Sequence, residues 1–144
     1  MRLTSIPVRL SDAPPSAATP DAVARRNAVG LREMFAIADS WTLGTEELAR
    51  LLGSSLRSLQ RWRRQAEGSG ALELSGDTVE RMSYLLGIQK ALRILLPTPE
   101  NQLRWLRQPN SEPVFAGQAP LSRMLQGRVA DLYVVRHYLD GMRG

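Results

Sequence analysis

The chain has 144 residues, of which 43% are hydrophobic, a formal net charge of +5 at pH 7 and no cysteine. Its length allows one modest core or two small ones, and the lack of cysteine excludes disulfides, thiolate metal sites and a cysteine nucleophile. The apolar stretches are short and interrupted by charge, and no secretory signal is visible, so we expect a cytoplasmic protein without a membrane partner.

Residues 1–20 are predicted to form a disordered arm. They carry several prolines separated by Ser, Ala and Thr, and such a segment buries too little apolar surface to offset the entropy of ordering. Arg2 and Arg9 are candidates for contacts with DNA phosphates, although an untethered tail is the simpler interpretation.

A helix is predicted from Asp21 to about Asp39, where apolar residues recur at helical spacing. Pro20 and Asp21 are typical of a helix start, whereas Gly30 weakens the middle, so the helix could break there. Trp41 and Leu43 are expected to pack this helix against the segment that follows, because an isolated two-helix unit has too small a core.

The segment Thr45–Arg64 has the pattern of a DNA-binding helix-turn-helix. Ala49 is expected where two short helices cross, and Gly53 can adopt the positive φ of a tight turn. Ser54 or Ser55 can cap the second helix. The inward face of this second helix is predicted to consist of Leu56, Leu59 and Trp62.

The outward face of the second helix carries polar side chains that suit a major groove. Arginine can donate two hydrogen bonds to a guanine edge, and glutamine can pair with adenine. Between Thr45 and Gln65 five arginines face two glutamates, which favours DNA binding over an ordinary solvated face. Arg50 and Arg64 are candidates for phosphate contacts. The candidate DNA-binding residues are Ser55, Arg57, Ser58, Gln60, Arg61 and Arg64.

Residues 67–70, Glu-Gly-Ser-Gly, are predicted to be a flexible connector. The next helix is expected to begin with a capping box of Asp77 and Glu80 and to stop before Pro97, and Gly87 in its middle would permit a close helix crossing. We therefore divide the chain into a disordered arm (1–20), a helix-turn-helix domain (21–67), a connector with a linking helix (68–96) and a C-terminal domain (97–144).

The C-terminal domain begins with another helix start, in which Thr98 caps and Pro99 takes the first helical position. Trp105 is expected on the buried side of that helix. Phe115, in the loop that follows, is either a core residue or an aromatic anchor for a partner, and the pattern favours the core.

A short apolar helix closed by Gly127 and a last helix from Arg128 to about Met142 complete the chain. No β pattern is visible. The predicted fold class is therefore all-α, with an N-terminal helix-turn-helix domain followed by a small helical C-terminal domain.

The stretch WLRQPNSEPVFAGQAPL, the short helix closed by Gly127, and a final helix ending in YLDGMRG resemble the C-terminal domain of the Xre/MbcA/ParS antitoxins. The helix-turn-helix occupies the place of that family's Xre-like domain. Two departures are visible, because Glu112-Pro113 lengthens the loop after Asn110 and Met142–Gly144 extend past the terminal glycine. The matching residues are Trp105, Leu106, Pro109, Asn110, Phe115, Gly117, Pro120, Leu121, Gly127, Val135, Leu139 and Gly141.

The resemblance implies a type II antitoxin. In that family the partner is a RES-domain toxin that degrades NAD or uses it to ADP-ribosylate a target; the C-terminal domain blocks the toxin's cleft, and the DNA-binding half represses the operon. The tail Asp140–Gly144 is our candidate for the blocking element, and the Asn110–Pro120 loop is the alternative. The candidate toxin-binding residues are Asn110, Phe115, Gly117, Pro120, Leu121, Arg136, Tyr138, Leu139 and Arg143.

The sequence predicts no enzyme site. His137 is the only histidine, so no histidine pair can hold a metal, and no nucleophile–base set or glycine-rich phosphate loop is visible. We interpret Asp131 and Asp140 as solvated helix-face charges and expect no cofactor and no metal. The alternative function is a simple helix-turn-helix regulator whose C-terminal half dimerises or senses a small molecule.

Helix-turn-helix proteins commonly read two half-sites, so we expect a homodimer on an inverted repeat of operator DNA and higher complexes with the toxin. The candidate DNA-binding residues precede the connector at Gly68–Gly70, and the family motif follows it. A fragment from Leu72 to Gly144 is therefore expected to bind and neutralise the toxin without binding DNA.

Overall fold

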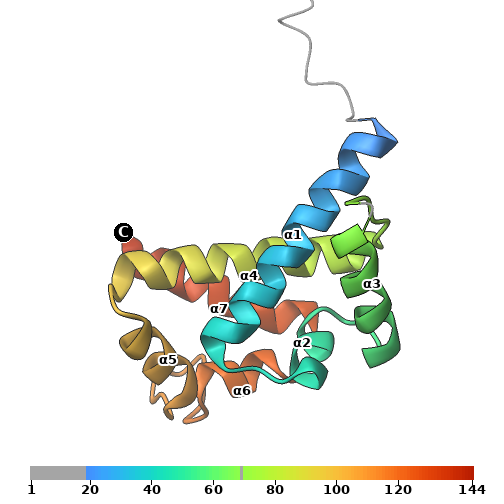
Figure 1. The fold of residues 1–144 in the computed structure, drawn as a ribbon. Helices are drawn as coiled ribbons and strands as arrows, with labels where there is room; N and C mark the ends of the chain where they lie inside the picture. Colours follow the sequence, from blue (N-terminus) through green and yellow to red (C-terminus); the bar gives the residue numbers. More distant parts are fainter. Residues whose placement is uncertain (1–18, 69) are drawn as a thin grey trace, which may run out of the picture.

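The computed structural model describes residues 19–68 and 70–144, and these residues form seven helices and no strand (Figure 1). The predicted all-α fold is thereby confirmed. The predicted arm lies almost entirely outside the described residues, as do Arg2 and Arg9. In chain order the helices are α1 (Pro20–Trp41), α2 (Thr45–Leu51), α3 (Leu56–Gly68), α4 (Gly76–Leu95), α5 (Pro99–Arg107), α6 (Pro120–Met124) and α7 (Val129–Arg143).

Helix α1 is longer than the sequence predicts and is not broken at Gly30. Thr19 caps it by accepting a hydrogen bond from the Ala22 N–H (3.1 Å), and Pro20 already lies in its first turn. A Cβ at Gly30 would lie 3.1 Å from Met82 Cε, so this glycine allows α4 to pack closely against an unbroken α1. The helix ends at Trp41, which is buried and anchors its last turn.

The cap of α4 differs from the predicted one. Ser75, and not Asp77, accepts the capping hydrogen bond from the Thr78 N–H (3.1 Å), and the helix begins at Gly76. Asp77 instead forms an ion pair with Arg81, one turn further along (2.9 Å). The predicted end of this helix before Pro97 is confirmed.

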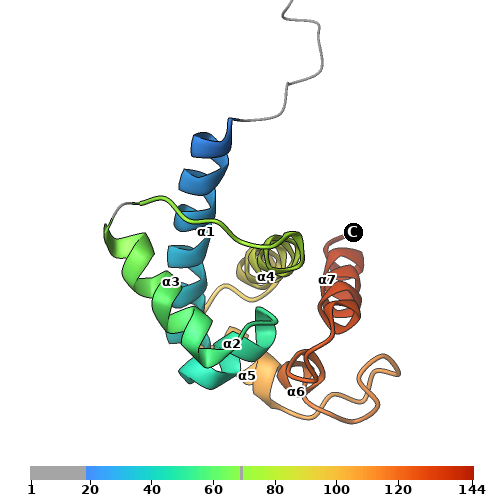
Figure 2. The same ribbon diagram turned by 90° about the vertical axis from the view of Figure 1, so that its right-hand side faces the viewer.

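Helix α4 is the central element of the fold. Figure 2 shows it nearly end-on between α1 and α7, and its most extensive packing is against α7. At Gly87, where the sequence predicts a close helix crossing, the space beside the glycine is instead occupied by the guanidinium of Arg136 on α7, which a Cβ would overlap. The buried side chains of α4 therefore belong to one core that both halves of the chain share.

Polar contacts also tie the two halves together. The indole N–H of Trp41 at the end of α1 donates to Gln89 Oε1 in α4 (2.8 Å), and both side chains are buried. Arg107 at the end of α5 donates to the carbonyl oxygen of Trp41 (2.9 Å), and Thr78 Oγ1 donates to that of Leu52 (3.3 Å). The predicted division at residues 67 and 96 thus falls within a continuous packing unit.

Candidate nucleic-acid interface and partner-binding domain

The turn between α2 and α3 is built around Gly53, whose φ is +67°. The Gly53 N–H donates to Arg50 O (3.2 Å) and the Ser54 N–H to Ala49 O (2.9 Å), which closes the end of α2. An ideal Cβ at Gly53 would lie 2.8 Å from Arg81 Nε. Both the backbone conformation and the lack of space therefore require glycine at this position.

Helix α3 presents an inward apolar face and an outward polar face, as the sequence predicts. Ser55 Oγ accepts a hydrogen bond from the Ser58 N–H (3.0 Å), so Ser55 is the cap. Leu59 is fully buried at the crossing with α2. Of the candidate DNA-binding residues, Ser58 is half-buried, and the exposed ones are Ser55, Arg57, Gln60, Arg61 and Arg64.

The arginines of this half fall into two groups. Within the described residues, Arg57, Arg61 and Arg64 make no ion pair, so their guanidinium groups are available to a ligand. Arg63, by contrast, lies over the ring of Phe35 (4.1 Å to its centroid) and helps to pack α3 against α1. The free arginines thus lie on α3, where a helix-turn-helix reads the major groove.

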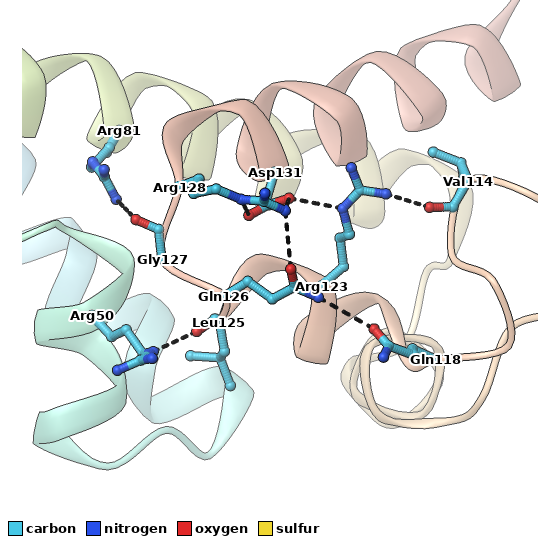
Figure 3. A network of polar contacts seen from close by, with 10 residues as sticks. All are labelled: Arg50, Arg81, Val114, Gln118, Arg123, Leu125, Gln126, Gly127, Arg128 and Asp131. Atoms are coloured by element: carbon cyan, nitrogen blue, oxygen red, sulfur yellow. Dashed lines mark hydrogen bonds and ion pairs between the residues drawn. The ribbon is translucent and has the colours of Figure 1, made fainter.

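Arginine side chains also connect the helix-turn-helix to the turn between α6 and α7 (Figure 3). Arg50 Nε donates to Leu125 O, so this predicted phosphate contact already has a protein partner. Arg81 donates to Gly127 O (2.9 Å) while its guanidinium packs against Gly53. The turn of the DNA-binding motif and a turn of the C-terminal domain therefore share one arginine.

An aromatic cluster forms the centre of the C-terminal domain. Phe115 is 1% exposed and meets Trp105 edge-on (ring centroids 5.7 Å apart) and Tyr138 edge-on (5.2 Å). Trp105 and Tyr138 are stacked. Of the two interpretations left open for Phe115, the structure supports the core residue.

The loop that precedes α6 is closed by its own backbone. The Asn110 N–H donates to Gln118 O (3.1 Å), and the Gly117 N–H donates back to Asn110 O (3.0 Å). Asn110 Oδ1 accepts from the Glu112 N–H (2.9 Å). Glu112 and the following proline are thereby accommodated in a compact loop, with Phe115 directed into the core.

A buried carboxylate organises the same domain (Figure 3). Asp131 is 0% exposed; it accepts hydrogen bonds from Arg123 (2.8 Å) and, at both oxygens, from Arg128 (3.0 Å each). Arg123 also donates to Val114 O (2.6 Å), which ties α6 and α7 to the loop. The interpretation of Asp131 as a solvated charge is wrong, because two arginines from the preceding segment enclose it.

The ionisation of Asp131 follows from these contacts. Burial raises the pKa of its carboxyl group, but the hydrogen bonds and positive charges of Arg128 and Arg123 outweigh that effect, and the pKa lies below its usual value. The carboxylate is therefore charged at neutral pH, and the network holds a net positive charge.

The candidate toxin-binding residues divide by depth. Gly117 and Arg143 are exposed, and Asn110, Arg136 and Tyr138 are half-buried. The remaining four are buried and belong to the core of the domain: Phe115, Pro120, Leu121 and Leu139.

The structure also shows a pair of exposed aromatic side chains that was not predicted from the sequence. Tyr133 and His137 on α7 are stacked, with their ring centroids 5.6 Å apart. Spacing of four residues on one helix was the signal that could have found them. Within 19–68 and 70–144, no group of three or more His, Cys, Asp or Glu side chains is placed to hold a metal ion.

Comparison with known families identifies both halves. The antitoxin Xre-like helix-turn-helix domain matches residues 22–87, and the antitoxin Xre/MbcA/ParS C-terminal toxin-binding domain matches residues 91–144. The chain belongs to the Xre/MbcA/ParS antitoxin family. It is an antitoxin-type protein with a DNA-binding helix-turn-helix domain and a toxin-binding domain, both built from helices.

A relative of nearly equal length is similar to most of the chain. The chain is 43% identical over 132 residues to "Uncharacterized protein y4oB" of Sinorhizobium fredii (strain NBRC 101917 / NGR234), which is 91% of this chain and 97% of that protein. Similarity therefore runs through both antitoxin domains. Among the described helices, none has the length and apolar character needed to cross a membrane.

Proposed function

We propose that this antitoxin neutralises a RES-domain toxin encoded beside it and represses their shared operon. The observation that carries the proposal is the joining, in one packed unit, of a toxin-binding domain and an α3 face with unpaired arginines. The RES identity of the toxin and its use of NAD rest on the resemblance of the motif from Trp105 to Gly141. Such a role would place the protein in the cytoplasm with its operator.

Direct contacts with the toxin are assigned to the accessible candidates. Gly117 on the loop and Arg136, Tyr138 and Arg143 on α7 can reach a partner, whereas the four buried candidates would act by holding the loop and α7 in place. Asn110 would fix the shape of the loop through its hydrogen bond to the Glu112 N–H.

The end of α7 remains our candidate for the element that blocks the toxin's cleft. It is helical to Arg143, close to the helix end predicted at about Met142. Asp140 pairs with Arg136 (3.2 Å) and Arg143 (3.7 Å), which stabilises that last turn. Met142 is 59% exposed beside them, so a preformed and partly apolar helix end is offered to a cleft.

Deleting Asp140–Gly144 from the full chain should leave toxin binding largely intact and restore NAD turnover by the toxin. The toxin is the product of the adjacent reading frame, and its affinity and NAD turnover are measured separately. Arg57→Ala is the matched control, because it alters the other half and should neutralise fully. Inhibition by the truncated chain equal to that of the intact chain would assign blocking to the Asn110–Pro120 loop. If the intact chain neither binds nor inhibits this toxin, only the role of a simple repressor remains.

Replacing Arg57 or Arg61 by alanine should weaken operator binding by about 1–3 kcal/mol and relax sequence preference, as expected for arginines that contact base edges. Arg64→Ala should weaken binding to all DNA alike and flatten its salt dependence. Fluorescence anisotropy on operator and random duplexes at several salt concentrations measures both effects. Arg93→Ala, an equal loss of charge at an exposed site near the end of α4, is the control. Equal losses on both duplexes for Arg57→Ala would reject its base contact.

A further inference from the structure

A groove between α1 and α4 is lined by aliphatic side chains and bordered by the charged residues Arg26, Glu33, Lys90 and Arg136. Its volume is about 430 Å³, and it is lined in part by Val29, Gly30, Val79, Met82 and Leu86. Val29 is 48% exposed and Val79 is 37% exposed. Aliphatic side chains that remain exposed around a hollow are typical of an interaction surface.

The face of α1 beside this groove has the spacing of a helix that packs against another helix. Six exposed or half-buried residues recur at alternating intervals of four and three, and three of the six are small. Arg26 and Glu33 lie on either side of Val29, and neither makes an ion pair within the described residues. The stripe consists of Ala22, Arg26, Val29, Glu33, Ala36 and Ser40.

The two charges are complementary to each other, but they cannot meet within one helix. Seven residues separate Arg26 from Glu33, which is about 10 Å along the helix axis. They lie at equal distances from a point between Val29 and Gly30. A second α1 packed antiparallel about that point would bring each Arg26 opposite the Glu33 of the other copy.

The symmetric arrangement also accounts for the apolar centre. Val29 of one copy would contact Val29 of the other across the twofold axis. The groove of each copy would receive the side chains that flank Val29 in the other copy. Each surface is then its own complement, which is the condition for a closed twofold dimer. A parallel arrangement would instead place like charges opposite one another, and that is unfavourable.

We propose that this face of α1, with the groove against α4, is the homodimer interface of the antitoxin. Most of the groove lies within residues 22–87, the helix-turn-helix domain, and only Arg136 of its lining belongs to the toxin-binding domain. The 22 residues of α1 give an interface element about 33 Å long. The inference rests on the proposed operator repression, in which two copies would place two α3 helices on an inverted repeat.

Charge reversal tests the interface without DNA or toxin, so its result is independent of the proposed neutralisation. Sedimentation equilibrium of the full chain should show a dimer. Arg26→Glu or Glu33→Arg alone should raise the dimer dissociation constant about tenfold or more, because like charges then oppose each other twice. The double variant, Arg26→Glu with Glu33→Arg, should restore dimerisation, since both pairs re-form with reversed polarity.

Arg104→Glu provides the matched control. It makes the same change of charge at an exposed site on α5, outside the stripe and the groove, and should leave the dimer unchanged. A wild-type chain that is monomeric at all concentrations would overturn the proposal. So would a double variant that is as weak as the two single variants combined. If the wild type is monomeric and Val29→Glu abolishes toxin binding, the groove belongs to the toxin and not to a second copy.

Discussion

Asp131→Asn should lower the free energy of unfolding by about 2–4 kcal/mol. Removing one partner of a buried ion pair costs about 3–5 kcal/mol, and the lower range applies here because Arg128 remains largely exposed to water. The substitution keeps the shape of the side chain but removes the charge that holds Arg123 and Arg128. Urea unfolding followed by circular dichroism measures the loss.

The pH dependence of stability should identify the same carboxylate. Burial raises the pKa of Asp131, but its two arginines lower the pKa by a larger amount. The pKa in the folded state is therefore below that of the unfolded chain. A lowered folded pKa adds stability that is fully present above the unfolded value of about 4 and is lost as pH falls below it. The difference between wild type and Asp131→Asn should therefore shrink as the solution is acidified from pH 5.

Asp140→Asn is the control for both measurements. It removes a carboxylate from the same helix, but the Asp140 side chain is 41% exposed, and exposed pairs contribute at most about 1 kcal/mol. Equal destabilisation by the two substitutions would show that Asp131 does not organise the domain.

Removing residues 1–71 should leave a fragment that does not fold, in contrast to the separable toxin-binding half expected from the sequence. Truncation removes Leu31, Met34 and Trp41, which are 0–1% exposed in the shared core. Each buried side chain of this size contributes about 1.5–3 kcal/mol, so their combined loss is comparable to the whole stability of a small protein. Gln89 would also lose the indole N–H that satisfies it.

Thermal unfolding monitored by circular dichroism should show no cooperative transition for the 72–144 fragment. The full chain carrying Arg57→Ala and Arg61→Ala is the control, because it should lose operator binding while keeping the transition of the wild type. A fragment with native helicity and a sharp transition would contradict the shared core. Point substitutions on α3 are therefore the appropriate way to separate the two proposed activities.

The features that the sequence predicts well have local signals. Gly53 and Ser55 act within a few residues of the turn that they define, and Thr98-Pro99 begins α5 as expected. Gly87 does leave space for a neighbour, but that neighbour is the guanidinium of Arg136, which lies far along the chain and could not be predicted. Periodicity shows that a face is buried without showing what covers it, so the joining of the halves by Trp41 and Gln89 could not be predicted.

The incorrect expectations arose where two local signals compete or a turn intervenes. Ser75 and Asp77 are both able to cap α4; in the structure Ser75 caps the helix, and Asp77 binds Arg81 one turn later. For Asp131, the contact with Arg123 passes across the turn at Gly127, where φ is +93°. A single-helix pattern treats these two residues as independent and places the carboxylate in solvent.

The contacts of Arg81 have a consequence for how such antitoxins diversify. Its guanidinium packs against Gly53 and donates to the carbonyl oxygen of Gly127. Both domains therefore contribute residues to this contact, and the residues on the two sides must be compatible. Recombination that exchanged whole domains between paralogues would place this arginine beside a C-terminal turn of a different sequence, to which it is not fitted. The exposed side chains of α3 carry no such constraint. Lineages of this family should therefore acquire new operators by gradual substitution on α3 more readily than by domain shuffling.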